Sequence, residues 1–101
     1  MRSFATMTAM LLMAVPALAG PVREAELRHL VLHDCGACHG MTLKGGLGPP
    51  LRPEALAGKD RSTLVDIVLD GITSTPMPPW RPWLNKAEAT WIVKTLQEGG
   101  F

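Results

Sequence analysis

Cys35-Gly36-Ala37-Cys38-His39 is the most informative stretch of this sequence. Two thiols separated by two residues can form thioethers with the two vinyl groups on one edge of a porphyrin, and C-x-x-C-H is the attachment motif of a c-type haem. The following histidine is then held against one face of the macrocycle, where its imidazole can bind iron as the proximal ligand. The motif therefore predicts one covalent haem c, bound through Cys35 and Cys38, with His39 as an iron ligand.

Two other interpretations of the cysteine pair are weaker. A structural zinc site needs four protein ligands. Since the chain has only two cysteines, such a site would have to recruit two of its three histidines, His29, His33 and His39. A thioredoxin-like redox pair would need a surrounding βαβ pattern, which the sequence lacks, and a plain structural disulfide would leave the histidine unexplained. Haem attachment accounts for all three side chains.

Residues 1–19 have the features of a cleavable export signal. Arg2 lies near the start, an apolar stretch covers residues 4–15, and the segment ends in Ala17-Leu18-Ala19. The apolar stretch is too short to be a convincing membrane span, and no cysteine stands at the cleavage position to carry a lipid. We place cleavage after Ala19, with an uncleaved anchor as the alternative. A haem c protein with such a signal is expected in a bacterial periplasm.

Residues 20–101 are expected to form one small domain, a monomer without a membrane span. The domain has nine basic and nine acidic side chains, because one of the ten Lys and Arg residues, Arg2, lies in the signal. This balance, made mildly acidic by two haem propionates, does not indicate binding to nucleic acid or to an anionic membrane surface. A domain of this size is marginal if it relies on its own apolar core, and the haem would complete that core.

The apolar pattern of this domain is helical and nowhere alternates as in a strand. A first helix is predicted from Glu24 to about Asp34, and it leads directly into the haem motif. Glycine and proline dominate residues 40–53, which predicts a loop on the proximal side of the porphyrin. A short helical turn is expected at residues 53–57, because Pro53 is tolerated at the first helical position.

Two further helices are predicted in the second half of the chain. Asp60 or Ser62 can cap the first of them, which Gly71 ends. Its apolar face is expected to consist of Leu64, Ile67 and Val68. Asn85, with Glu88 three residues later, resembles a capping box that opens the last helix. The buried stripe of that helix is expected to consist of Ala89, Ile92, Val93 and Leu96. The sum is an all-α domain of three main helices plus short turns around one haem.

The second axial ligand of the iron separates an electron carrier from a catalyst. Only two of the six methionines, Met41 and Met77, lie outside the N-terminal signal region. Met41 follows His39 by two residues and is tied to the proximal side. Met77 lies in residues 73–83, which hold four prolines and cannot form a regular helix. Such a stiff loop can hold a thioether over the distal face, so we expect Met77 to bind the iron; a methionine that fills a gap beside an aromatic ring is the alternative.

Three ordered motifs resemble those of class I monohaem cytochromes c. They are Cys35-Gly-Ala-Cys-His39-Gly40, Gly46-Leu47-Gly48-Pro49-Pro50-Leu51 and Thr75-Pro76-Met77-Pro78-Pro79, followed by an amphipathic C-terminal helix. The resemblance covers essentially all of residues 20–101 and implies a cytochrome c fold. In that family, the proline after the glycine accepts a hydrogen bond from Nδ1 of the proximal histidine, which here implies Pro49 and His39.

One feature departs from this family. The chain has no tyrosine, and Thr95 stands where many members carry an aromatic residue on the last helix. Trp91 is expected to do that packing instead. The contact between the first and last helices is therefore the part of the fold for which the sequence gives the least support.

A narrower resemblance suggests a biological setting. Leu-His-Asp-Cys-Gly-Ala-Cys-His-Gly at residues 32–40 and Thr-Pro-Met-Pro-Pro-Trp at residues 75–80 are similar to cytochrome c55X, the small cytochrome found with the haem cd nitrite reductase of denitrifying bacteria. This implies a periplasmic electron carrier between a respiratory donor and nitrite reductase. A maturation factor that helps to assemble the reductase or its special haem is the alternative. With both axial positions filled, we do not expect an enzyme; a small peroxidase or gas-binding protein would need an open distal position.

Other polar and aromatic side chains are weaker candidates. Trp80 and Trp83 are expected to pack on the haem edge or under the ligand loop. Three basic side chains can neutralise haem propionates, although solvated surface charge is the better interpretation of each: Arg52, Arg81 and Lys86. The i, i+4 pair His29 and His33 can share a metal ion, but two exposed surface histidines are far more common.

Overall fold

The computed structural model describes residues 2–12 and 20–101. The expected cleavage position after Ala19 and residues 13–19 lie outside the described residues. Within the described ranges the chain forms helices and turns but no strand, which confirms the all-helical expectation, and residues 2–12 form no helix. No helix in the described part of the chain is both long enough and apolar enough to cross a membrane.

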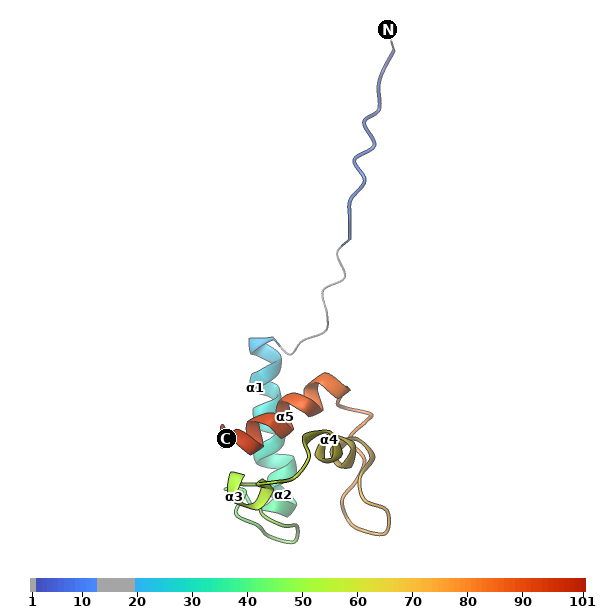
Figure 1. The fold of residues 1–101 in the computed structure, drawn as a ribbon. Coiled ribbons are helices and arrows are strands. Elements are labelled where there is room, and N and C mark those ends of the chain that lie inside the picture. The colour runs from blue at the N-terminus through green and yellow to red at the C-terminus, as the bar shows by residue number, and fades with distance from the viewer. Residues whose placement is uncertain (1, 13–19) are drawn as a thin grey trace.

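The first half of the domain is one continuous helical run (Figure 1). It consists of α1 (Pro21–Leu30), a single π-helical turn η1 (Val31–Cys35) and α2 (Gly36–His39). The predicted bounds of the first helix, Glu24 to about Asp34, are therefore wrong at both ends. The helix begins earlier because a proline in the first turn needs no hydrogen-bond acceptor. It continues to the end of the haem motif because a bond from the Gly36 N–H to the Val31 carbonyl absorbs one extra residue without breaking the helix.

The short helix α3 (Pro53–Leu56) and the helix α4 (Arg61–Asp70) follow. The cap of α4 is Asp60, whose carboxylate accepts a bond from the Thr63 N–H at 3.0 Å, while Ser62 only donates its hydroxyl to that carboxylate. The predicted apolar face of α4 is not its most deeply buried face. Val65 and Leu69 are the buried side chains, and the expected set is only half-buried: Leu64, Ile67 and Val68.

The last helix, α5 (Lys86–Glu98), matches its prediction closely. The capping box is present: the Glu88 N–H donates to Oδ1 of Asn85 at 2.8 Å, and the Asn85 N–H donates to Oε1 of Glu88 at 3.0 Å. All four residues of the predicted stripe are buried, namely Ala89, Ile92, Val93 and Leu96. The helix ends at Gly99, which adopts the left-handed conformation with φ 74°.

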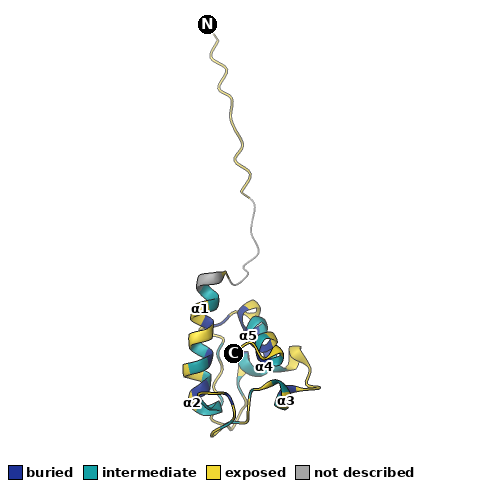
Figure 2. Cartoon of the chain, turned by 90° about the vertical axis from the view of Figure 1, so that its left-hand side faces the viewer, coloured by how far each residue is buried: buried dark blue, intermediate teal, exposed yellow. Residues whose placement is uncertain are grey.

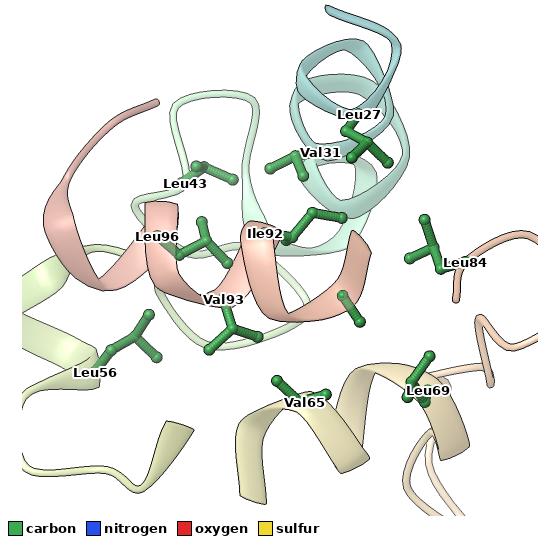
Figure 3. Close-up of a cluster of buried hydrophobic side chains, with 11 residues drawn as sticks. Leu27, Val31, Leu43, Leu56, Val65, Leu69, Leu84, Ile92, Val93 and Leu96 are labelled. Atoms are coloured by element: carbon green, nitrogen blue, oxygen red, sulfur yellow. The ribbon is translucent and has the colours of Figure 1, made fainter. Parts of the chain in front are cut away.

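The apolar core is arranged around α5 (Figure 3). Leu27 and Val31 approach it from the N-terminal run, and Val65 and Leu69 approach it from α4. Figure 2 shows exposed and buried positions following each other around α1, as expected for a helix that packs on one side. The core therefore joins segments from both ends of the domain and leaves the two long loops, residues 40–52 and 71–85, to carry the candidate site.

Arg28 makes one of the contacts between the first and last helices, the part of the fold with the least support from sequence. Its guanidinium lies 5.4 Å from the ring centroid of Trp91 and 5.4 Å from that of Phe101, and it donates to the Gly100 carbonyl at 2.6 Å. The two rings meet edge to face at 6.0 Å. The expectation that Trp91 supplies the aromatic packing is confirmed, but its partners, an arginine and the last residue of the chain, are not ones that periodicity indicates.

Candidate functional site

The two cysteines stand one helical turn apart on the η1–α2 segment. Both are free thiols and both are half-buried. Burial raises the pKa of the Cys35 thiol to about 11, and the negative charge of Asp34 adds to this effect. The thiol is therefore protonated at neutral pH, and a protonated thiol is a poor nucleophile.

The loop of residues 40–52 folds back on the end of α2. The Gly45 N–H donates to the His39 carbonyl at 2.8 Å, and the Gly48 N–H donates to the Cys38 carbonyl at 2.7 Å. These bonds satisfy carbonyls that a helix terminus leaves without partners. The same fold-back places the Pro49 carbonyl oxygen 2.7 Å from Nδ1 of His39. A carbonyl can only accept, so Nδ1 carries the hydrogen and Nε2 is left as the ring nitrogen with a free lone pair.

Gly48 is a part of this arrangement whose role the sequence did not reveal. A Cβ atom on Gly48 would lie 2.8 Å from both Cε1 and Nδ1 of His39. The imidazole therefore packs directly against the backbone of Gly48. Any side chain at position 48 would displace the His39 ring. The signal that could have found Gly48 is its position immediately before the proline that accepts the histidine hydrogen bond.

Met77 lies in the connection between α4 and α5, residues 71–85. Its side chain is half-buried, its carbonyl accepts from the Ile72 N–H at 3.3 Å, and its own N–H donates to the Thr75 hydroxyl at 3.3 Å. The loop that carries it and the 40–52 loop both reach the lower end of the domain in Figure 1, away from the N-terminal segment. No hydrogen bond among the described residues joins Met77 to His39, and its role as iron ligand stays a prediction.

Met41, the other methionine outside the signal region, is placed differently. It is 57% exposed, and its sulfur lies 3.4 Å from the position that a Cβ on Gly36 would occupy. It therefore stays beside the haem motif itself, as the sequence predicted from its closeness to His39.

The donor set fits a c-type haem. Two free thiols one turn apart and an imidazole whose Nε2 lone pair is available are the groups that hold a c-type haem, and a methionine thioether is a common second iron ligand. The contact between Gly48 and the His39 ring fixes the plane of the imidazole, which a metal ligand needs. Any haem at this site would be held by Cys35 and Cys38.

The remaining candidates lie on the surface or in the core. His29 and His33 are exposed with ring centroids 4.2 Å apart, and the described residues contain no grouping of three or more His, Cys, Asp or Glu side chains placed to hold a metal ion. Trp80 is half-buried against the core. Trp83 is 62% exposed, and the two indole rings meet edge to face with their centroids 5.7 Å apart. Two of the basic candidates have protein partners and the third is exposed: Arg52 donates to the Thr42 carbonyl, Arg81 pairs with Asp70, and Lys86 faces solvent.

Comparison with known proteins places this chain among c-type cytochromes. The family model described as cytochrome c oxidase, cbb3-type, subunit III, matches residues 22–94. A cytochrome c55X of Paracoccus denitrificans is 50% identical over 90 residues, which cover 86% of this chain and 87% of that protein. A cytochrome c55X of Pseudomonas aeruginosa is 58% identical over 77 residues, which cover 76% of this chain but 65% of that protein, so the chain spans somewhat less than two thirds of this relative.

Two solved structures are also similar. The c-type cytochrome NirC superposes with a TM-score of 0.78 at 56% identity, over 79% of this chain and 94% of that one. The dihydro-heme d1 dehydrogenase NirN, in complex with DHE, superposes with a TM-score of 0.63 at 33% identity, over 69% of this chain but only 15% of that one.

The helical fold, the haem motif and the matched family model together define a monohaem c-type cytochrome. Within that class, identities of 45–58% to three relatives show that the chain belongs to the cytochrome c55X family.

Proposed function

We propose that this chain is an electron carrier of the bacterial periplasm, exported by residues 1–19 with cleavage after Ala19, that passes single electrons to the dissimilatory nitrite reductase of denitrification. The observation that carries the proposal is the hydrogen bond of 2.7 Å between Nδ1 of His39 and the Pro49 carbonyl, which orients Nε2 as a metal ligand. The choice of nitrite reductase as the acceptor rests on membership of the cytochrome c55X family. A respiratory protein would supply the electrons.

Each site residue has a separate task in this proposal. Cys35 and Cys38 would hold one haem c covalently, and His39 and Met77 would bind its iron. The haem, when bound, supplies one-electron chemistry, because its iron alternates between Fe(II) and Fe(III). Pro49 keeps the His39 ring in one tautomer and one orientation. The chain's own contribution is thus to bind, orient and enclose the redox group.

A carrier is favoured over an enzyme by the ligand set. With His39 and Met77 both bound to the iron, no coordination position would remain for a substrate, and the methionine would favour the ferrous state and raise the reduction potential. The proline-rich loop around Met77 restricts movement of the sulfur between the two oxidation states. Docking to partners would use a small and transient patch near the thioether edge, as redox encounters commonly do.

The ligand assignment is tested by comparing Met77→Ala with Met41→Ala in the haem-loaded protein. Met77→Ala should open the site to carbon monoxide, abolish the methionine-to-iron charge-transfer band of the oxidised protein and lower the reduction potential. Met41→Ala should leave all three properties unchanged, because Met41 lies beside the haem motif and is exposed. A normal band and potential in Met77→Ala would remove this residue from its assigned role.

The partner is tested by stopped-flow oxidation of the pre-reduced protein with purified nitrite reductase. Rapid transfer followed by nitrite-dependent turnover is expected of a donor. The absence of transfer, with the His/Met spectrum intact, would reject nitrite reductase as the acceptor.

A second candidate function is assembly of nitrite reductase or of its specialised haem. The observation that favours it is the similarity of this chain to part of the dihydro-heme d1 dehydrogenase NirN, at 33% identity. Deletion of this chain distinguishes the two functions. A carrier should leave a reductase that is fully assembled but receives few electrons, whereas an assembly factor should leave a reductase with incomplete haem content.

A further inference from the structure

Gly71 has a backbone conformation that few other residues can adopt. It closes α4 through a bond of 2.8 Å from its N–H to the Ile67 carbonyl, and its dihedral angles are φ 67° and ψ −171°. This region of conformational space is open essentially to glycine alone, because a Cβ atom would collide with the local backbone. The chain therefore needs a glycine at the point where α4 turns into the loop of Met77.

Gly71 also contacts the backbone of the predicted ligand segment. A Cβ atom at this position would lie 2.6 Å from the Met77 carbonyl oxygen, 2.8 Å from the carbonyl carbon of Pro78 and 2.9 Å from the nitrogen of Pro79. All three distances are well below van der Waals contact. The atoms concerned are backbone atoms flanked by prolines, so no flexible side chain can turn aside. Residues 77–79 thus pack directly on the bare Cα of Gly71.

The far side of the loop is fixed to the same helix. The Trp80 N–H donates to the Val68 carbonyl at 3.1 Å, and the Arg81 N–H donates to the Leu69 carbonyl at 3.2 Å. Both acceptors belong to the last turn of α4, whose carbonyls have no partners within the helix. The loop is consequently attached to the last turn of α4 at its start, through Gly71, and at its far side, through Trp80 and Arg81. It cannot move away from a side chain at position 71 without breaking these hydrogen bonds.

We propose that Gly71 is a positioning residue for Met77: its missing side chain lets the backbone of residues 77–79 sit at the depth that brings the Met77 sulfur to the iron. The inference rests on the proposed function, since it takes Met77 as the axial ligand. Gly71 has no side chain with which it could bind the iron itself. A side chain there moves the Met77 backbone outward, and the sulfur moves with it.

Gly58 offers a matched control. It also has a positive φ, 75°, but a Cβ atom there would meet nothing within 4 Å. Gly58→Ala therefore carries the dihedral strain of an alanine at positive φ without any contact to a functional segment. Gly58→Ala thus controls for an alanine at positive φ, whereas Gly71→Ala adds both the contact with residues 77–79 and a ψ of −171° that glycine alone adopts readily.

The experiment compares haem-loaded Gly71→Ala, Gly58→Ala and Met77→Ala chains. The readouts are the methionine-to-iron band of the oxidised protein, carbon monoxide binding to the reduced protein and the melting temperature. Gly58→Ala should lower the melting temperature but keep the band and exclude carbon monoxide. Gly71→Ala should weaken the band and raise the carbon monoxide association constant about tenfold or more, equivalent to about 1.4 kcal/mol.

Two outcomes separate this inference from the proposed function. If Met77→Ala keeps a normal band, the ligand assignment is wrong and the role of Gly71 is rejected with it. If Met77→Ala loses the band while Gly71→Ala behaves as Gly58→Ala does, the ligand assignment stands and the positioning role alone is rejected.

A second variant covers the case in which Gly71→Ala does not load haem. Ser74, in the same loop, has a positive φ of 65°, so Ser74→Gly relieves strain and gives the loop freedom to shift. The double variant Gly71→Ala/Ser74→Gly should load haem and show a weakened band, whereas Ser74→Gly alone should show a normal one. A normal band in the double variant would overturn the inference.

Discussion

The Pro49 carbonyl accepts a hydrogen bond from Nδ1 of His39 at 2.7 Å, and the loop that brings the two together is itself bonded to the end of α2. The imidazole is thus held from two directions, by the carbonyl at its nitrogen and by the Gly48 backbone against its ring. A metal ligand fixed in this way needs little rearrangement on binding.

Gly48→Ala should destabilise the haem-loaded protein, because the new methyl group would overlap the His39 ring. We expect a loss of about 1–3 kcal/mol in the free energy of unfolding, the usual range for overpacking, and a shifted reduction potential. The measurements are urea unfolding and potentiometric titration. Leu47→Ala is the control, since Leu47 is 79% exposed and should change neither quantity. Equal behaviour of the two variants would contradict a role for Gly48 in holding the ring.

Arg28→Ala should loosen the contact between the first and last helices. The variant loses the stacking of the guanidinium on Trp91 and Phe101 and the bond to the Gly100 carbonyl, which together are expected to cost about 1–2 kcal/mol of unfolding free energy. Arg28→Lys should recover only part of this loss, because an ammonium group cannot stack as a planar guanidinium does. Urea unfolding measures both, and full recovery by lysine would show that charge alone matters.

Arg23→Gln should reduce the dependence of stability on pH in the acid range. The hydrogen bond from Arg23 holds the pKa of the Glu88 carboxyl below its usual range, with a smaller contribution from the Asn85 N–H. Ionised Glu88 therefore stabilises the fold at pH values above the pKa of an unfolded glutamate, about 4.3. This stabilisation is lost as the pH falls through the pKa of Glu88 in the folded protein, which is lower. The melting temperature of Arg23→Gln should be below that of the parent at neutral pH, and the two should converge towards pH 3.

Glu26→Gln is the control for this comparison. Glu26 is the other carboxylate that Arg23 contacts, at 2.8 Å, but it is exposed, and exposed ion pairs contribute little. Its melting temperature should follow that of the parent at every pH. A constant difference between Arg23→Gln and the parent from pH 7 to pH 3 would mean that the Arg23–Glu88 pair does not cause the pH dependence.

Asn85→Ala should lower the free energy of unfolding by about 1 kcal/mol, the usual cost of losing an N-cap side chain. The hydrogen bond from the Glu88 N–H to the Asn85 side chain is lost, and the first turn of α5 becomes less stable. Lys86→Ala, one residue later and exposed, should change stability by less than about 0.5 kcal/mol. Thermal unfolding of both variants checks the prediction, and similar losses in the two would argue against the capping box.

Several features followed from short stretches of sequence because their physical basis is local. The haem motif needs only five consecutive residues, and the capping box of α5 needs Asn85 and Glu88, which lie within one turn. The buried stripe of α5 was correct because the alternative face carries charged residues. The hydrogen bond between His39 and Pro49 was expected from a family resemblance, and the structure contains it.

Other features required segments that are distant in the chain to meet. Two neighbouring apolar rows lie on α4, and packing against α5 buries Val65 and Leu69 more deeply than the predicted apolar face. The helical run continues through the haem motif because a π-type bond to Val31 accommodates an extra residue, which no local preference indicates.

The sequence by itself determined the class of protein, the attachment motif and the helical content, since these depend on residue identity and spacing. Only the tertiary structure decided which glycines matter. Gly48 and Gly71 are two of ten glycines, and what distinguishes them is a neighbour brought close by folding: the His39 ring in one case and the Met77 backbone in the other. Steric exclusion acts between atoms in space, and a glycine's neighbours in space are not encoded in its neighbours along the chain.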